Sequence, residues 1–254
     1  MKLSVYIVTL NEEQRLNRTL LQAAKVADEI IIVDSGSADD TVNIAHKHGA
    51  KVIFHEWESY CKQKHFAEQQ CKNDWVLLLD ADEVLSDALV AEINNLGNKP
   101  KYNAYRIKIT NMLPHEETPR KFAETFNVVR LYNRKHASMP EDLWNKDRVS
   151  VDKGQKIGNL KAPILHYCLL SIEQATDKYN KHSTELQKTL IAEKRRFSIL
   201  RLVTEFPRQF CRYYFCKKFI FMGVNGFIQA MLLANFRFLK IAKYFEARSQ
   251  NRKN

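Results

Sequence analysis

The first hundred residues alternate between short apolar runs and longer stretches in which apolar residues recur at helical spacing. Between residues 12 and 27, Leu16, Leu20 and Ala24 fall on one face of a helix. The apolar runs are LSVYIVTL (3–10), EIIIVDS (29–35), KVIFH (51–55) and DWVLLLD (74–80). Strands that alternate with helices form a mostly parallel sheet with helices on both of its faces. The alternation therefore predicts an α/β fold.

The remaining pattern divides the chain in two. Further helices are expected at 37–49, 61–71 and 87–96. Ser37 or Asp39 is placed to cap the first of these helices and Ser86 the last. The next part is less regular, and its strand-like runs are 105–110, 126–133 and 163–167. The pattern then becomes helical to the end, so we predict an α/β domain over 1–168 and a basic helical region over 169–254.

Polar residues gather directly after the apolar runs. Asn11 and Glu12 follow the first run, Asp34 lies at the end of the second, and Asp80 and Asp82 follow the fourth. In an open α/β sheet, ligands bind outside the carboxyl ends of the strands. These residues are therefore expected along one ligand-binding edge of the sheet.

The triplet Asp80-Ala81-Asp82 indicates a divalent metal. On an extended strand, residues two apart project to the same side about 6.7 Å apart, and their carboxylates repel unless a cation lies nearby. Mg²⁺ and Mn²⁺ take carboxylate oxygens and complete their coordination with water and substrate phosphates. Neither GxGxxG nor GxxxxGK[ST] occurs, so neither a dinucleotide site nor a P-loop is expected. The alternative is that the acids only end the strand and cap the next helix.

The excess positive charge is confined to the last quarter of the chain. Residues 192–254 hold 14 Lys/Arg and 3 Asp/Glu, whereas the preceding residues hold 26 of each kind. This distribution predicts an anionic partner for the C-terminal region.

A long uncharged run lies inside this basic region, at 219–236. Its 18 residues reach the lower limit for spanning a bilayer. Because polar residues and glycines interrupt the run, a helix lying in the membrane interface is favoured over a span, and a buried helical subdomain is the other alternative. Basic and aromatic residues over 195–218 also fit nucleic acid, but the uncharged run disfavours that partner.

Cysteine usage indicates the compartment. The five cysteines are scattered without a CxxC pair, which is typical of reduced thiols, and no N-terminal signal peptide is visible. We therefore expect a cytoplasmic protein that is peripheral on the inner face of the cytoplasmic membrane. No feature of the sequence predicts an oligomeric state.

Three motifs resemble the family 2 inverting glycosyltransferases, which have the Rossmann-like GT-A fold. The motifs are SVYIVTLNEE, IIIVDSGSADDT and DWVLLLDADE, and the resemblance covers residues 2–96. It implies a nucleotide sugar bound by Thr9, Asn11, Glu12 and Asp34. It also implies that Asp80 and Asp82 hold a divalent metal, Mg²⁺ or Mn²⁺, together with the diphosphate. Lys64, in CKQKHF, resembles a basic residue that faces the phosphates in such enzymes; the alternative is a solvated helix face.

A closer resemblance is to the bacterial glucosyltransferases that add glucose to the first heptose of the lipopolysaccharide inner core. It depends on LLDADE, RLYNR (130–134) and GNLKAPILHY (158–167). It implies UDP-glucose as the donor and a lipid-linked saccharide as the acceptor. The alternatives are a related transferase for capsule or exopolysaccharide precursors and a non-catalytic membrane- or RNA-binding module.

The catalytic base is expected between these motifs, because inverting transfer needs a carboxylate that takes the proton of the acceptor hydroxyl. The glucosyltransferases usually show V-H-[DE]-[KR]-V, and the corresponding stretch here is WNKDRV (144–149), with Lys146 in place of the histidine. Asp147 matches the closer family and is favoured, while Asp142 matches the wider family. His166, in PILHY, is interpreted as a core histidine rather than a site residue.

Overall fold

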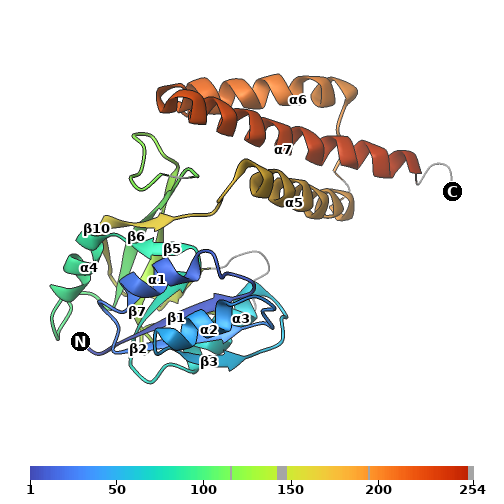
Figure 1. Ribbon diagram of the computed structural model, residues 1–254. Helices are drawn as coiled ribbons and strands as arrows, with labels where there is room; N and C mark the ends of the chain where they lie inside the picture. The colour runs from blue at the N-terminus through green and yellow to red at the C-terminus, as the bar shows by residue number, and fades with distance from the viewer. Residues whose placement is uncertain (115, 142–147, 194, 251–254) are drawn as a thin grey trace. The chain divides into compact units, whose positions relative to one another are not determined.

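The computed structural model describes residues 1–114, 116–141, 148–193 and 195–250. The chain forms two compact units. Unit 1 comprises residues 1–111 and 124–168, and unit 2 comprises residues 112–123 and 169–254. Figure 1 shows the sheet of unit 1 with its helices, and the helices of unit 2.

Unit 1 is built on a mixed sheet that, over the described residues, has eight strands in the order β3-β2-β1-β4-β7-β6-β10-β5. The strands are β1 (Leu3–Thr9), β2 (Glu29–Asp34), β3 (Lys51–Phe54), β4 (Trp75–Asp80), β5 (Glu83–Leu85), β6 (Ala104–Asn111), β7 (Thr125–Asn133) and β10 (Ile157–His166). Pairing is parallel from β3 to β4 and between β6 and β10, while β7 and β5 run antiparallel to their neighbours. Strands β8 (Ala137–Ser138) and β9 (Ser150–Val151) form a separate pair. The predicted α/β fold with a mostly parallel sheet is confirmed.

Helices cover both faces of this sheet because successive residues of a strand point to opposite sides. Ile7 and Leu77 lie in an apolar cluster with residues of three helices, α1 (Leu16–Ala23), α2 (Thr41–Lys47) and α4 (Asp87–Asn94). Tyr6 and Leu78 lie in a second cluster with residues of α3 (Tyr60–Gln69). The sheet is therefore the middle layer between α3 and the other three helices.

The ends of the helices agree only in part with the sequence signals. Ser86 caps α4 as predicted, because its hydroxyl accepts a hydrogen bond from the N–H of Leu89. Ser37 does not cap α2, since its hydroxyl donates to Asp34. Helix α1 begins at Leu16 and ends at Ala23, so it is shorter than the predicted 12–27, and the chain before it turns at Asn11, which has a left-handed φ of 56°. The residues between β1 and α1 therefore form a loop at the edge of the sheet.

Unit 2 is helical, as the sequence predicts. Its elements are α5 (Ile172–Ala192), α6 (Ile199–Cys211), a π-helical turn η1 (Arg212–Cys216), a 3₁₀ turn η2 (Phe219–Met222) and α7 (Gly223–Gln250). Helix α7 packs on α5 through the ring of Phe236, whose centroid lies 5.4 Å from those of Tyr179 and His182. A Cβ atom at Gly226 would lie 2.0 Å from the carbonyl oxygen of Phe219. Glycine at this position lets η2 fold back against α7.

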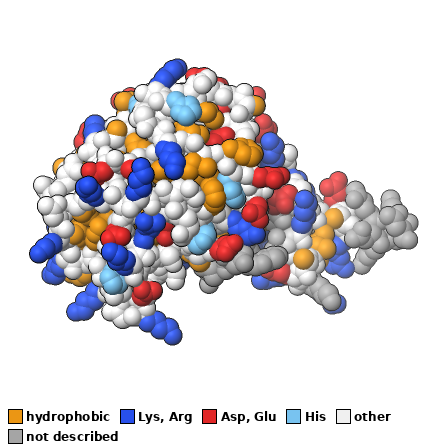
Figure 2. All heavy atoms as spheres, turned by 90° about the horizontal axis from the view of Figure 1, so that it is seen from below, with side chains coloured by type: hydrophobic (Ala, Val, Ile, Leu, Met, Phe, Trp, Pro, Cys, Tyr) orange, Lys and Arg blue, Asp and Glu red, His pale blue; other side chains and the backbone are white. Residues whose placement is uncertain are grey.

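The segment Phe219–Ser249 could cross a membrane as judged by length and composition alone, and 39% of its most apolar window is buried in protein. One such helix is weak evidence for a span, because core helices of soluble proteins meet the same criteria. On the face of the molecule shown in Figure 2, acidic and basic side chains are interspersed and hydrophobic side chains form small separate groups.

Candidate active site

Strands β1 and β2 end side by side, with Thr9 and Asp34 paired in the parallel register. The buried carboxylate of Asp34 accepts a hydrogen bond of 2.8 Å from Thr9 Oγ1. It also accepts bonds from the N–H groups of Gly36 and Ser37, at 2.9 and 2.8 Å. Asp34 therefore holds the loop after β2 against the end of β1.

Asn11 and Glu12 extend this edge. The side-chain oxygen of Asn11 accepts a hydrogen bond of 2.9 Å from the N–H of Ala38, and the carboxylate of Glu12 pairs with Arg15 at 2.7 Å. The structure thus brings the four residues predicted to hold the nucleotide to one end of the sheet. Arg15 was not predicted, because a single arginine in a helical stretch carries no local signal of a site.

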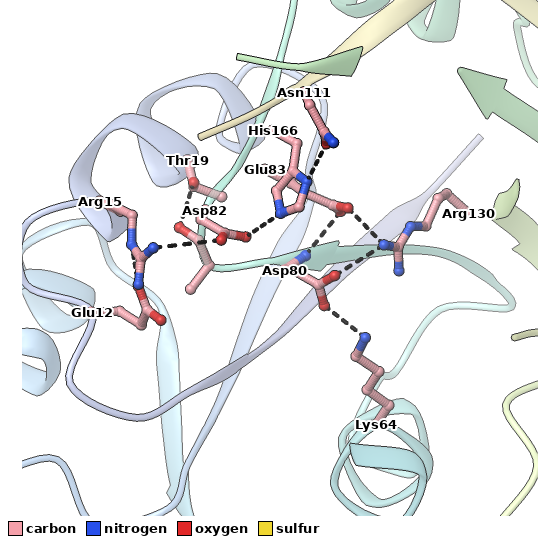
Figure 3. Close-up of polar contacts among 11 residues, drawn as sticks. Glu12, Arg15, Thr19, Lys64, Asp80, Asp82, Glu83, Asn111, Arg130 and His166 are labelled. Atoms are coloured by element: carbon pink, nitrogen blue, oxygen red, sulfur yellow. Dashed lines mark hydrogen bonds and ion pairs between the residues drawn. The ribbon is translucent and has the colours of Figure 1, made fainter. Parts of the chain in front are cut away.

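The two aspartates of the triplet face different partners (Figure 3). Asp80 Oδ1 lies 2.7 Å from Lys64 Nζ, and Oδ2 lies 3.0 Å from Arg130 Nη2. Asp82 Oδ1 lies 3.3 Å from His166 Nε2, and Oδ2 lies 3.6 Å from Arg15 Nη1. The two carboxylates have different nearest partners, although the charge of Asp80 still acts on Asp82 and opposes the lowering of its pKa. Strand β4 ends at Asp80 and the next two residues form a turn, so the spacing of an extended strand does not apply.

Lys64 is buried and points at Asp80, so it does not lie on a solvated helix face. A buried ammonium group is stable only when it is paired. Burial opposes ionisation of Asp80, but the charges of Lys64 and Arg130 outweigh that effect and hold the pKa of Asp80 well below its usual range. Asp80 is therefore an anion whose charge is balanced by two cations.

His166 reaches Asp82 through strand pairing. Strands β6 and β10 end in register at Asn111 and His166, and the antiparallel strand β5 places Glu83 opposite His166. His166 Nδ1 lies 2.9 Å from the side-chain oxygen of Asn111, which leaves Nε2 facing Asp82. Burial lowers the pKa of His166, but the hydrogen bond with Asp82 outweighs it and raises the pKa. The interpretation of His166 as a core residue is wrong, since its side chain is 21% exposed and lies in the site.

Asp82 and His166 fit a divalent cation. Asp82 Oδ1 and His166 Nε2 face each other 3.3 Å apart, and a carboxylate oxygen and an imidazole nitrogen are both ligands that such an ion accepts. The bond from Nδ1 to Asn111 fixes the ring orientation, as is usual for histidines that bind metals. No group of three or more His, Cys, Asp or Glu suited to a metal exists among the described residues. An ion at this pair would therefore take its other ligands from water and a diphosphate.

The buried ion pair of Arg130 and Glu83 is joined to the cluster through Asp80. Arg130 Nη2 lies 2.6 Å from Glu83 Oε1 and bridges Glu83 to Asp80. Burial raises the pKa of Glu83 to about 7, although the charge of Arg130 opposes this rise. The sequence shows Arg130 and Glu83 only as parts of two distant motifs. The pairing of β7 with β4 that brings them together has no local signal.

A cleft of about 500 Å³ opens beside the cluster in unit 1. It is lined by Asp80, Glu83, His166, Arg106, Phe126 and Arg148. Arg106 and Arg148 are exposed and form no ion pair within the described residues. The cleft can therefore admit a ligand, with two guanidinium groups available to an anionic or hydroxyl-rich molecule.

The two candidate bases, Asp142 and Asp147, lie outside the described residues. The chain just before them is held by α3: the N–H of Met139 donates to Glu68 at 2.6 Å, and His65 Nδ1 lies 2.6 Å from the carbonyl oxygen of Met139. Because Lys64 on the same helix contacts Asp80, α3 is bonded both to the aspartate of β4 and to the chain leading into 142–147.

We expect the ionisation of Glu68 to make the free energy of unfolding depend on pH. Burial raises the pKa of this carboxyl, which also accepts a hydrogen bond of 2.7 Å from Tyr132. The folded protein therefore holds the proton more tightly than the unfolded chain, in which the pKa is about 4.3. This contribution to stability is complete below about pH 4.3 and is lost as the pH rises through the folded-state pKa. Urea unfolding should show wild type losing stability relative to Glu68→Gln as the pH rises; a difference independent of pH would contradict this.

Comparisons with known proteins agree with this geometry. Residues 4–147 match the family described as "Glycosyl transferase family 2". An uncharacterized glycosyltransferase of Rickettsia typhi is 40% identical over 99% of this chain and 89% of its own length. The lipopolysaccharide core biosynthesis glycosyltransferase LpsC of Rhizobium meliloti is 30% identical over 96% of this chain and 92% of its own length.

A solved structure supports the fold. The crystal structure of S. aureus TarS superposes with a TM-score of 0.50 at 20% identity, covering 73% of this chain and 40% of TarS. At this identity the likeness concerns the fold alone. The sequence match and the two relatives go further, and they show that the chain belongs to glycosyl transferase family 2.

Proposed function

We propose that this glycosyltransferase is an inverting, metal-dependent enzyme that transfers glucose from UDP-glucose to a lipid-linked saccharide, the heptose of a lipopolysaccharide inner core. The pair formed by Asp82 and His166 carries the proposal, since it joins the nucleotide edge to a cleft large enough for an acceptor. The relationship to LpsC, whose name assigns it to lipopolysaccharide core biosynthesis, supports the acceptor.

The donor half of the site accounts for the residues on the edge of the sheet. The residues assigned to the nucleotide are Thr9, Asn11, Glu12 and Asp34. Lys64 and Arg15 bring positive charge close to Asp80 and Asp82, where the diphosphate is expected. Asp82 and His166 would hold Mg²⁺ or Mn²⁺, which when bound balances the negative charge of the leaving diphosphate. Asp80 forms ion pairs with Lys64 and Arg130 and thereby keeps both cations in position.

The acceptor half is assigned to the cleft beside Arg106 and Phe126. An acceptor hydroxyl there attacks the anomeric carbon from the side opposite the diphosphate, and a single displacement inverts the configuration. Asp147, or alternatively Asp142, takes the hydroxyl proton as the new bond forms. A lipid-linked acceptor places the reaction at the inner face of the cytoplasmic membrane, and the basic residues of unit 2 suit a peripheral attachment there.

Incubation with labelled sugar nucleotides and lipopolysaccharide from a core-truncated strain tests the proposal. We expect glucose to be transferred from UDP-glucose and not from GDP- or dTDP-linked sugars. Removal of divalent ions by stringent chelation should lower the rate at least a hundredfold, on the order of the loss of one charge-stabilising group, and added Mg²⁺ or Mn²⁺ should restore it. Full activity after chelation would exclude the metal, and transfer from another donor would exclude UDP-glucose.

A further inference from the structure

Helix α6 presents its apolar side to solvent and its polar side to the protein. Ile199, Leu200 and Val203 are 72%, 71% and 68% exposed, whereas Glu205 and Gln209 are 2% and 4% exposed. These residues recur at three- and four-residue spacing, so each set forms one side of the helix. A helix on the surface of a soluble protein normally has the reverse orientation.

Hydrogen bonds explain how the polar side is buried. The carboxylate of Glu205 lies 2.7 Å from Arg201 Nε and 2.8 Å from Arg208 Nη2, and it accepts a bond of 2.9 Å from the amide of Gln209. Burial opposes ionisation of Glu205, but the hydrogen bond from Arg208 and these neighbours outweigh it and lower its pKa. Both carboxylate oxygens of Glu205 therefore have partners within α6, and this is how the helix buries an acid on its inner side.

The exposed apolar side continues from α6 onto α7, which lies beside it in unit 2 (Figure 1). The ring of Phe227 on α7 lies edge-on to Phe210 and Tyr214, with centroid distances of 5.6 and 5.8 Å. Val224, one turn before Phe227, is 76% exposed. We call this surface the α6–α7 apolar face; its main residues are Ile199, Leu200, Val203, Phe210, Val224 and Phe227.

Exposed apolar side chains grouped on two neighbouring helices in this way mark a binding site for a partner. The charge around it identifies the partner. Arg195, Arg196 and Arg212 precede or follow α6 in the sequence and are exposed, and the whole segment 192–254 has only three acids. Two of those acids are neutralised, because Glu205 is buried between arginines and Glu193 pairs with Arg195 at 3.1 Å. Apolar side chains bordered by cations match a bilayer surface with anionic headgroups.

We propose that the α6–α7 apolar face docks on a bilayer that contains anionic lipids. The inference deepens the proposed function and depends on it for the membrane as the place of reaction. It also changes the expected contact: within the uncharged run 219–236, Gln229, Ala230 and Ala234 are buried in protein. Helix α6, outside that run, provides three of the four aliphatic side chains of the face, Ile199, Leu200 and Val203, each at least 68% exposed.

Cosedimentation of the full-length protein with vesicles tests this surface. Wild type should bind vesicles of phosphatidylethanolamine and phosphatidylglycerol (3:1), and bind at least tenfold more weakly to phosphatidylcholine alone or in high salt, where the attraction is screened. The double variant Leu200→Gln/Val203→Gln should bind the anionic vesicles at least tenfold more weakly. The matched control Leu21→Gln/Ile172→Gln removes two other exposed apolar side chains and should bind like wild type.

The outcomes separate this surface from the proposed chemistry. Transfer of glucose to a soluble, delipidated acceptor oligosaccharide should be equal in wild type and the α6 double variant, because neither residue lies in the active site. Vesicle binding without any glucose transfer would reject the proposed donor and acceptor but keep the docking surface. Equal vesicle binding by the α6 variant and wild type would overturn the docking surface. The wild-type protein could instead bind no vesicles and form a dimer that Leu200→Gln/Val203→Gln converts to a monomer. That result would assign the face to a second copy of the chain.

Discussion

Replacing Asp82 with asparagine is expected to lower the rate of sugar transfer about a thousandfold, or about 4 kcal/mol in activation free energy. The amide keeps the size of the side chain and can still contact Arg15. It loses the negative charge that faces His166, and with it the carboxylate ligand of the proposed metal. Because this carboxylate would hold the cation that balances the charge developing on the diphosphate, the loss should appear in kcat rather than in KM alone.

The matched control is Asp87→Asn. Asp87 lies on α4, has a side chain that is 83% exposed, and pairs with Lys25 on the surface. This variant removes the same charge from the same unit and should retain full activity. Thermal unfolding of both variants should stay close to that of wild type. Turnover by Asp82→Asn within tenfold of wild type would remove Asp82 from the site.

The architecture of unit 1 was predictable because its signals are local. The continuous apolar runs of β1, β2 and β4 have the composition of strands buried on both faces, and Tyr6 and Ile7 do face opposite helical layers. The capping bond of Ser86 is also local, because its hydroxyl accepts from the N–H of Leu89, three residues later. The order of strands around β7 and β10 has no such signal, since it depends on pairings between residues more than forty positions apart.

The site was predictable only up to the ends of the strands. The rule that ligands bind at the carboxyl ends correctly groups Thr9 with Asp34. It does not show that the chain turns after Asp80, and beyond that turn Asp82 has different partners from Asp80. His166 lies in the site because the edge strand β5 pairs antiparallel with β10. The three residues of β5 do not indicate this pairing in the sequence.

Helix α6 shows the same limit in unit 2. Its sequence is strongly amphipathic, and the usual inference would bury Leu200 and Val203. The structure buries Glu205 instead, because Arg201 and Arg208 on neighbouring turns of the same helix satisfy its charge. Periodicity identifies two sides of a helix, but the partners available on each side decide which one packs.

The buried pair of Arg130 and Glu83 is expected to dominate the stability of unit 1. At a pH well above the pKa of about 7 that Glu83 has beside Arg130, Arg130→Met should lower the free energy of unfolding by about 3–5 kcal/mol, because it leaves the carboxylate of Glu83 buried without its cation. Asp80 retains Lys64, so its charge stays balanced. All three tryptophans of the sequence (Trp57, Trp75 and Trp144) fall within the residue ranges of unit 1, so urea unfolding followed by tryptophan fluorescence reports on this unit.

Adding Glu83→Gln to Arg130→Met should restore most of the lost stability. The neutral amide no longer needs a cation, and its oxygen can still accept the hydrogen bond of 3.1 Å that the N–H of Asp80 donates. The exposed pair of Lys135 and Asp74 provides the control, since Lys135→Met should cost less than about 1 kcal/mol. If Arg130→Met cost no more than that control, or if Glu83→Gln deepened the loss, the pair would not be what holds β4, β5 and β7 together. Recovery in the double variant would show that the penalty comes from the orphaned charge of Glu83 and not from the lost volume of the arginine, because the second substitution adds no packing at position 130.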